Sequence, residues 1–176
     1  MIPGEEGKDY ADSGLTIQQA MVDHAKRFPE RGMRPDCILW NGLQVKTGAS
    51  LSVPKKGVVR AAFVKCDNEM EQGFDIKVNG SLELENGEKV RLLRTWYDVR
   101  LESVVKYPFH SDDGQLWIWN VYKVRYPNER IVEERWTGNA GFWVEEKSPS
   151  HFAFHCSPGP LTVPNFESLV FEISIR

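Results

Sequence analysis

The residues best suited to proton transfer lie in the segment His151-Phe152-Ala153-Phe154-His155-Cys156. In a strand, alternate side chains share a face, so His151 and His155 lie on one face about 13 Å apart. One zinc ion, with bonds of about 2.1 Å, cannot reach both rings. Cys156 points to the opposite face and cannot pair with His155. We interpret His155 as a candidate general acid or base lining a pocket. The alternative is that both histidines are exposed or hydrogen-bonded without a chemical role.

A second set of polar residues alternates along a predicted long strand. Arg94, Trp96 and Asp98 share one face, and the residues between them are mostly apolar. If both faces are covered, Arg94 and Asp98 form a buried pair that marks a polar site, and they join His155 as catalytic candidates. If one face is in water, the same residues form a solvated, charge-paired surface.

The aromatic residues predict where a ligand would bind. The segment Leu116–Tyr126 is apolar on both faces in its first half, whereas a strand with one face in water alternates. It is therefore either sandwiched or lines a cavity. Asn120 separates these cases, because a pocket gives its amide a ligand or water and a dry core gives it backbone. The predicted ligand-binding residues are Trp96, Trp117, Trp119, Asn120, Tyr122, Trp136 and Trp143.

Trp136 and Trp143 flank a glycine-containing corner. Gly138 and Gly141 permit a bend there, and Asn139 tolerates a left-handed backbone. Aromatic rings beside such a corner are suited to stacking on a sugar or another planar ligand. The alternative is that they anchor the core at a strand corner.

The overall composition is that of an ordinary folded domain. The chain has 176 residues, 41% hydrophobic and 27% charged, with a net charge of −3. These values favour one domain and give no basis for binding nucleic acid or a membrane. No apolar run approaches the roughly 20 residues that span a bilayer, and the N-terminus has no apolar signal core, so we expect a cytoplasmic protein.

Motifs for metals and cofactors are missing from the sequence. The three cysteines are far apart and odd in number, which favours reduced thiols over disulfides. No metal-ligand spacing, phosphate-binding loop or nucleotide-binding motif is present, so neither a metal nor a cofactor is expected.

The elements that must position these residues are mainly strands. Residues 1–14 predict a flexible lead-in, and residues 15–176 predict a single β-rich domain. Its helix, 15–28, carries a capping-box pattern at Thr16 and Gln19. Strands follow from residue 37 onward, beginning with a hairpin around Asn41-Gly42.

The remaining strand predictions concern bends and turns. Phe74–Glu85 alternates through Gly80, which predicts one strand with a bulge rather than a turn. A three-residue loop near Asn86-Gly87 leads to a long strand, Lys89–Tyr107, which must bend because it exceeds ordinary strand length. A turn is predicted at Ser111–Gly114.

These features predict an all-β, mainly antiparallel fold: a lipocalin-like or calycin-like barrel, or a strongly curled β-sandwich, with one N-terminal amphipathic helix. The plan of one helix followed by long aromatic strands resembles small lipocalin-like barrels and related barrel cyclases. That resemblance implies an apolar or aromatic small molecule in an enclosed cavity, with binding alone or a cofactor-independent isomerase, cyclase or lyase activity.

Two other functions stay open. One is a non-catalytic β-sandwich module that binds carbohydrate or protein through an exposed aromatic patch. The other is a structural or assembly subunit, for which a homodimer would bury the apolar surplus.

Overall fold

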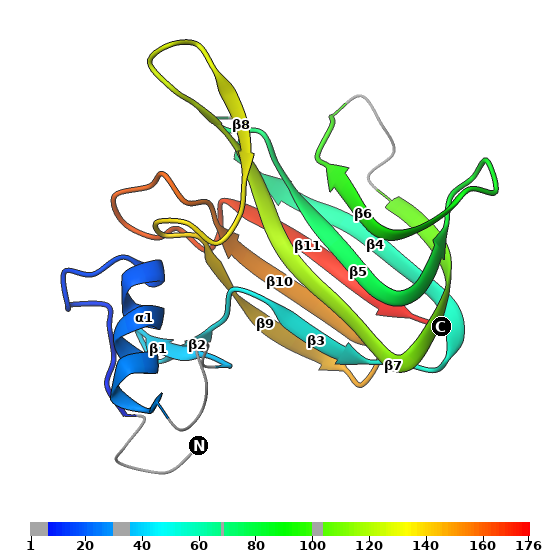
Figure 1. The fold of residues 1–176 in the computed structure, drawn as a ribbon, viewed down its shortest axis with the longest axis horizontal. Coiled ribbons are helices and arrows are strands. Elements are labelled where there is room, and N and C mark those ends of the chain that lie inside the picture. The colour runs from blue at the N-terminus through cyan, green and yellow to red at the C-terminus, as the bar shows by residue number, and fades with distance from the viewer. Residues whose placement is uncertain (1–6, 30–35, 68, 100–103) are drawn as a thin grey trace.

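The computed structural model describes residues 7–29, 36–67, 69–99 and 104–176, and within these ranges it is mostly antiparallel β-structure with one α-helix (Figure 1). The elements are α1 (Ile17–Arg27), β1 (Ile38–Trp40), β2 (Leu43–Val45), β3 (Ala49–Ser52), β4 (Lys56–Cys66), β5 (Gln72–Glu83), β6 (Lys89–Trp96), β7 (Val104–Arg125), β8 (Ile131–Glu134), β9 (Gly141–Ser148), β10 (His151–Ser157) and β11 (Leu169–Ile175).

The helix and the first hairpin confirm their predictions. Thr16 caps α1: its side chain accepts a hydrogen bond from the Gln19 N–H, and the Gln19 side chain accepts one from the Thr16 N–H. In the hairpin, Ile38 lies opposite Val45. Asn41 and Gly42 both have positive φ, 49° and 75°, as a type I′ turn requires.

The large sheet has nine strands, and β7 is central to it. The strand order is β6-β5-β7-β4-β11-β10-β9, and β3 and β8 also pair with β7. Successive parts of β7 pair with β4 over 104–110, with β3 over 115–118 and with β8 over 122–125. One long strand thus joins two parts of the sheet.

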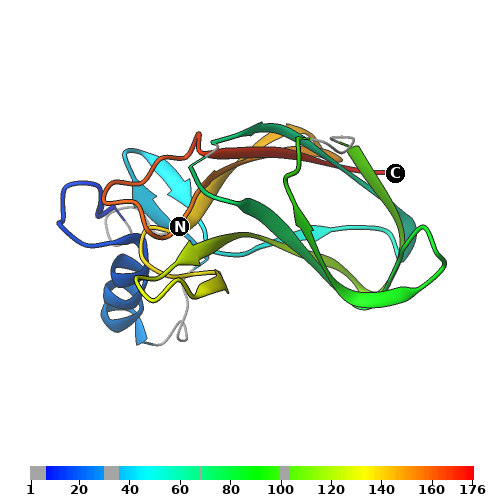
Figure 2. The same cartoon turned by 90° about the horizontal axis from the view of Figure 1, so that it is seen from above.

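The sheet bends so that these parts face each other. Figure 2 shows β4, β10 and β11 on one side and β3, β5 and the C-terminal half of β7 on the other. The space between them holds stacked rings. The centre of the Phe171 ring lies 4.5 Å from that of Phe74 and 4.9 Å from that of Phe154, and all three side chains are fully buried. Aromatic stacking of this kind fills the interior with side chains.

A second apolar cluster joins α1 to the β1–β2 hairpin. Tyr10 is fully buried in it, and the Tyr10 N–H donates to the Leu39 carbonyl at 2.9 Å. Asp9 accepts hydrogen bonds from the N–H groups of Asn41 and Gly42. Asp9 and Tyr10 therefore have defined partners, and the flexibility expected of residues 1–14 stays a prediction. The first six residues lie outside the described ranges.

Two strand predictions are wrong. The expected strand Lys89–Tyr107 ends at Trp96, because its partner β5 begins at Gln72, whose carbonyl accepts from the Tyr97 N–H. The next strand begins at Val104. Residues 100–103 of the expected strand lie outside the described ranges.

The predicted turn at Ser111–Gly114 is instead a bulge inside β7. Gly80 of β5 lies opposite Ser111, and Val78 lies opposite Leu116, so on the β5 side residues 112–115 of β7 are opposed by Asn79 alone. The Ser111 hydroxyl accepts from the Gln115 N–H, which closes the extra residues into a local loop. The turn-forming residues therefore bend the strand without ending it.

Candidate functional site

A buried carboxylate lies on the outer face of the sheet. Asp75 of β5 is the register partner of Arg94 on β6 and of Trp119 on β7. The Asp75 side chain points away from the core face that Phe74 and Ile76 occupy, yet it is fully buried. A charge in such a place requires partners on all its acceptor positions.

Arg94 and Trp119 supply those partners. The Arg94 guanidinium donates from Nε to Asp75 Oδ1 at 2.7 Å and from Nη2 to Oδ2 at 2.8 Å, and Trp119 Nε1 donates to Oδ2 at 2.8 Å. The hydrogen bond to Asp75 raises the pKa of the Arg94 guanidinium. This two-pronged pair fixes the planes of both groups and the orientation of the indole.

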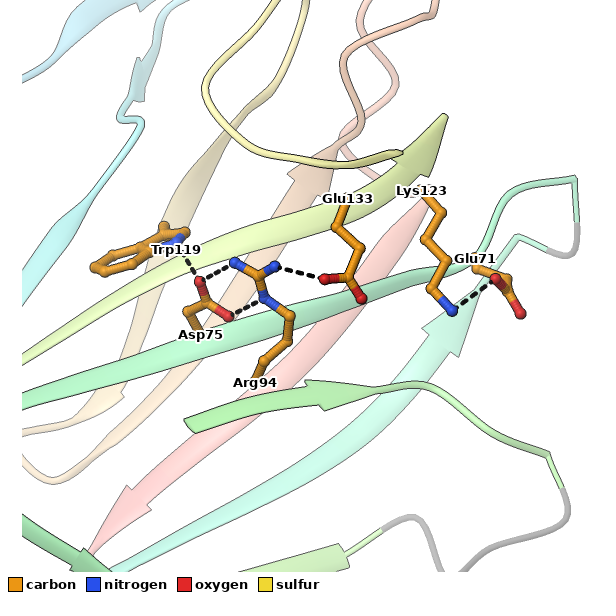
Figure 3. Close-up of polar contacts among 6 residues, drawn as sticks. All are labelled: Glu71, Asp75, Arg94, Trp119, Lys123 and Glu133. Atoms are coloured by element: carbon orange, nitrogen blue, oxygen red, sulfur yellow. Dashed lines mark hydrogen bonds and ion pairs between the residues drawn. The ribbon is translucent and has the colours of Figure 1, made fainter. Parts of the chain in front are cut away.

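The row of charges continues toward the end of the sheet (Figure 3). Arg94 Nη1 donates to Glu133 Oε2 at 3.1 Å. Beyond it, the Lys123 ammonium lies 3.0 Å from Glu71 Oε2 and 4.8 Å from the centre of the Trp96 ring. Acidic and basic groups therefore alternate, and Lys123 is held by a carboxylate and an aromatic face.

This row ends at an open hollow of about 370 Å³ near the ends of β4 and β6 and the start of β5. Its lining residues are Cys66, Asp67, Met70, Glu71, Gln72, Trp96, Tyr97, Asp98, Val99 and Lys123. An adjoining hollow of about 480 Å³ shares Met70, Glu71 and Lys123. Among its described lining residues, the 370 Å³ hollow, hereafter the end hollow, combines aromatic surface with three carboxylates and one ammonium.

Gln72 is the unusual residue of the end hollow. Its side chain is 1% exposed, and its Nε2 donates to Ser168 Oγ at 2.9 Å. Its Oε1 is buried and has no hydrogen-bond partner within the described ranges. Such an acceptor costs about 1–3 kcal/mol if nothing donates to it, so its position calls for an explanation.

The thiol in the end hollow is a poor nucleophile. Burial, and to a smaller extent the neighbouring Asp67 carboxylate, raises the pKa of the Cys66 thiol to about 11. Cys66 is therefore neutral at pH 7, whereas thiol chemistry requires the thiolate.

The predicted site residues are only partly brought together. Trp96 and Asp98 line the end hollow, and Arg94 lies two residues from Trp96 on the same strand. The pair expected between Arg94 and Asp98 is replaced by pairs of Arg94 with Asp75 and Glu133. Residues four apart on a strand are about 13 Å apart, whereas cross-strand partners are in contact.

His155 lies elsewhere, on the outer face of β10. Its ring stacks on Trp143 with 4.0 Å between centres and 5° between planes. Its Nδ1 lies 2.9 Å from Glu167 Oε1 and its Nε2 lies 3.2 Å from Glu145 Oε2. Both nitrogens therefore face carboxylates, an arrangement that suits a structural ion-pair cluster, and none of these residues lines the end hollow.

The remaining predicted ligand-binding residues occupy different environments. Asn120 Nδ2 donates to the Ser157 carbonyl at 3.0 Å, which is the backbone partner expected in a dry core. Tyr122 is buried, and its hydroxyl donates to the Thr137 carbonyl. Trp136 packs on Trp119, and Trp117 is 45% exposed. These side chains do not converge on one cavity.

Sequence reasoning missed Gln72 and the four residues that accompany Arg94 in the charged row. One of them carried a signal: Asp75 stands between Phe74 and Ile76, and aspartate is depleted in strands. The others are paired by strand register, which the sequence does not display. They are Gln72, Glu71, Lys123 and Glu133.

Within the described ranges, no group of three or more His, Cys, Asp or Glu side chains is placed to hold a metal ion. In the same ranges, no helix combines the length and apolar character needed to cross a bilayer.

Comparison with known proteins finds no matching family model, no matching curated protein and no matching solved structure.

Proposed function

We propose that this protein binds a small molecule with an aromatic or apolar body in the end hollow. The described lining carries the proposal, because the rings of Trp96 and Tyr97 stand among polar side chains at this end of the sheet. A few placed polar groups in a partly apolar recess are typical of ligand sites.

Of the two expected fold forms, we propose the strongly curled β-sandwich. Its support is the strand order, in which β6 and β9 stand at opposite ends and do not pair with each other. A closed barrel requires such end strands to meet. The stacked phenylalanines between the facing parts of the sheet then favour a site at the end of the sheet over one in the enclosed interior.

Binding without catalysis is the better-supported form of this proposal. The described lining of the end hollow contains no histidine, its thiol is neutral, and its lysine is paired with Glu71. An isomerase, cyclase or lyase would need a group that moves a proton, and in the described lining the carboxylates of Asp67, Glu71 and Asp98 are the groups that could do so. Such an activity, like the cytoplasmic location, stays a prediction.

One observation favours a second candidate, the carbohydrate- or protein-binding module. Trp117 is 45% exposed on the outer face of β7, and its register partners are Ser50 and Lys77. An exposed indole among polar groups is suited to stacking on a sugar ring.

Ligand titration separates the two candidates. We expect the neutral dye prodan to bind wild-type protein saturably, with its emission shifted to the blue. Trp96→Ala should weaken binding at least fivefold, and Trp96→Phe, which keeps a ring, should weaken it less. Trp117→Ala is the matched control and should leave binding unchanged, with thermal unfolding used to check each fold.

The opposite pattern would favour the module. Loss of binding in Trp117→Ala with wild-type affinity in Trp96→Ala would move the site to the outer face of β7. If wild-type protein showed no saturable binding of prodan, the proposed function would be overturned.

A further inference from the structure

We propose that the outer face of the sheet around Trp117 binds an acidic sugar, namely a hexuronate unit of an oligosaccharide. This inference goes beyond the end hollow. It rests on the second candidate function, because it names the ligand class of the surface on which Trp117 stands. It is carried by the exposed indole, by two cations that have no ion-pair partner and by the neutral polar groups beside them.

The first step concerns the aromatic surface. Trp117 shares the outer face of β7 with Trp119, and its side chain is 45% exposed. Trp119 is only 7% exposed, and Trp136 packs on it with 5.3 Å between ring centres. Trp117 therefore offers a ring to solvent where Trp119 is covered, and one indole matches the apolar face of one sugar ring.

The second step concerns the charge next to this indole. On the outer face, the neighbours of Trp117 along β7 are Gln115 and Trp119, and its partners across the strands are Ser50 and Lys77. Lys77 is exposed and makes no ion pair within the described ranges. Cross-strand partners have Cβ atoms about 5 Å apart, so the Lys77 ammonium reaches a ligand stacked on Trp117.

Three carboxylates near this surface already have partners. Asp75 is buried and accepts two hydrogen bonds from Arg94, which also donates to Glu133 (Figure 3). Asp113, in the bulge of β7, accepts a hydrogen bond from a backbone N–H of the bulge at 3.0 Å. Within the described chain, Lys77 therefore keeps a charge that a ligand carboxylate would pair.

A second cation stands beside Trp119. The Arg135 guanidinium lies 5.7 Å from the centre of the Trp119 ring and 4.5 Å from that of Trp136. Among the residues that the structure describes, no carboxylate pairs with it. Trp117 and Trp119 are about 7 Å apart along the strand, so a chain of acidic sugars that extends from Trp117 along β7 meets a second positive charge.

The neutral groups favour a sugar over a nucleic acid. The Ser50 hydroxyl donates to Gln115 Oε1, which leaves the Gln115 Nε2 hydrogens for a sugar hydroxyl. A single-stranded nucleic acid is held by several stacking rings and by a row of cations along its phosphates. One exposed indole with two cations fits a short acidic sugar chain better.

Matched oligosaccharides test the charge preference. The acidic probes are the trimers of galacturonate, glucuronate and mannuronate, and the neutral partner of each is its methyl ester. Calorimetry at pH 7 measures the affinities. We expect at least one acidic trimer to bind saturably and at least fivefold more tightly than its ester, because the ester keeps the ring but loses the charge. Oligothymidylate is titrated as the nucleic-acid probe.

The outcomes distinguish this inference from the functions on which it bears. Equal binding of acid and ester would overturn the acidic preference while leaving a carbohydrate surface in place. Tighter binding of oligothymidylate than of every trimer would overturn the sugar as the ligand class. Failure of all these probes would overturn the inference and the carbohydrate form of the second candidate, whereas the prodan titration decides the end hollow separately.

Variants of the ring test the place of binding. Trp117→Ala should weaken binding of the preferred acidic trimer at least tenfold, and Trp117→Phe should weaken it less. Thermal unfolding is measured for both variants. A folded Trp117→Ala protein with wild-type affinity would overturn the placement of the ligand on this face.

A pair of lysines supplies the matched control for charge. Lys77→Met should lower the acid-to-ester affinity ratio at least threefold. Lys106→Met makes the same change in net charge at another exposed lysine of β7, where the strand pairs with β4, and should leave the ratio unchanged. Equal effects of the two variants would show that net charge, and not the position of Lys77, determines the preference.

Discussion

Asp75 holds its negative charge on a sheet face where its own side chain has no exposure to solvent. Three hydrogen bonds, two from Arg94 and one from Trp119, replace the water that the carboxylate would otherwise bind. The pair therefore contributes orientation as much as stability: it fixes the Trp119 indole and positions Arg94 toward Glu133.

Removing the carboxylate should be costly. We expect Asp75→Ala to lower the free energy of unfolding by about 3 kcal/mol, because it leaves a mostly covered guanidinium with one partner. The measurement is urea denaturation at pH 7. Glu133→Gln, which removes the exposed partner of Arg94, is the control and should cost no more than about 1 kcal/mol.

A double variant separates two contributions to the free energy of unfolding: the loss of the ion pair and the cost of leaving one charge without its partner. Asp75→Leu with Arg94→Met replaces both charges by apolar side chains, and it should cost less than Asp75→Ala alone. Equal or greater cost in the double variant would show that the ion pair itself stabilises the sheet.

At the scale of elements, the bend of the sheet depends on Gly80. This residue has φ of +153°, and a Cβ built on it would lie 2.0 Å from the His110 carbonyl oxygen of β7. Residues with a side chain rarely adopt this φ, and the β7 backbone lies too close to leave room for a Cβ atom. The approach of β5 to β7 at the bulge thus requires glycine.

Gly80→Ala should therefore destabilise the protein strongly. We expect a loss of about 3 kcal/mol or more, from backbone strain and overpacking together, measured by urea denaturation. Gly87→Ala is the matched control: its φ is also positive, at +83°, but nothing lies within 4 Å of its added Cβ. It should cost about 1–2 kcal/mol, and equal losses at the two positions would contradict the close approach.

Local chemistry explains which elements the sequence predicted. The capping box at Thr16 and the Asn41-Gly42 turn are satisfied within a few residues, so both were predicted correctly. The bulge at Gly80 was also predicted, because the alternation continues across it. In contrast, β6 ends where its partner β5 begins. The end of β6 is therefore set by a different strand and cannot be read from the residues of β6 itself.

The same reasoning applies to the candidate site. Trp96 and Asp98 were predicted because their types and spacing are visible in one strand, and both line the end hollow. Gln72 and Lys123 reach it through the register of β5 and β7, which depends on bulges in both strands. Residue types can be read from a sequence, but register follows from long-range packing.

At the scale of the whole molecule, Asn139 connects two apolar clusters. It lies in the glycine-containing corner and is 3% exposed. Its Oδ1 accepts from the Ile17 N–H at the start of α1, and its Nδ2 donates to the carbonyls of Leu161 and Thr162. The corner, which directly precedes β9, thus holds the start of α1 against the large sheet.

Asn139→Ala should loosen this connection without unfolding the sheet. We expect a loss of about 2 kcal/mol, because the variant leaves the Ile17 N–H and the Leu161 carbonyl without these partners. Hydrogen exchange should become faster at the amides of α1, while the amides of β11 keep their protection, as in separate cooperative units.

Asn128→Ala is the control: the Asn128 side chain also accepts a hydrogen bond from a backbone N–H, that of Arg130, but in an exposed turn. It should leave exchange in α1 unchanged. If Asn139→Ala accelerated exchange equally in α1 and β11, the two clusters would unfold as one unit and the connecting role of Asn139 would be wrong.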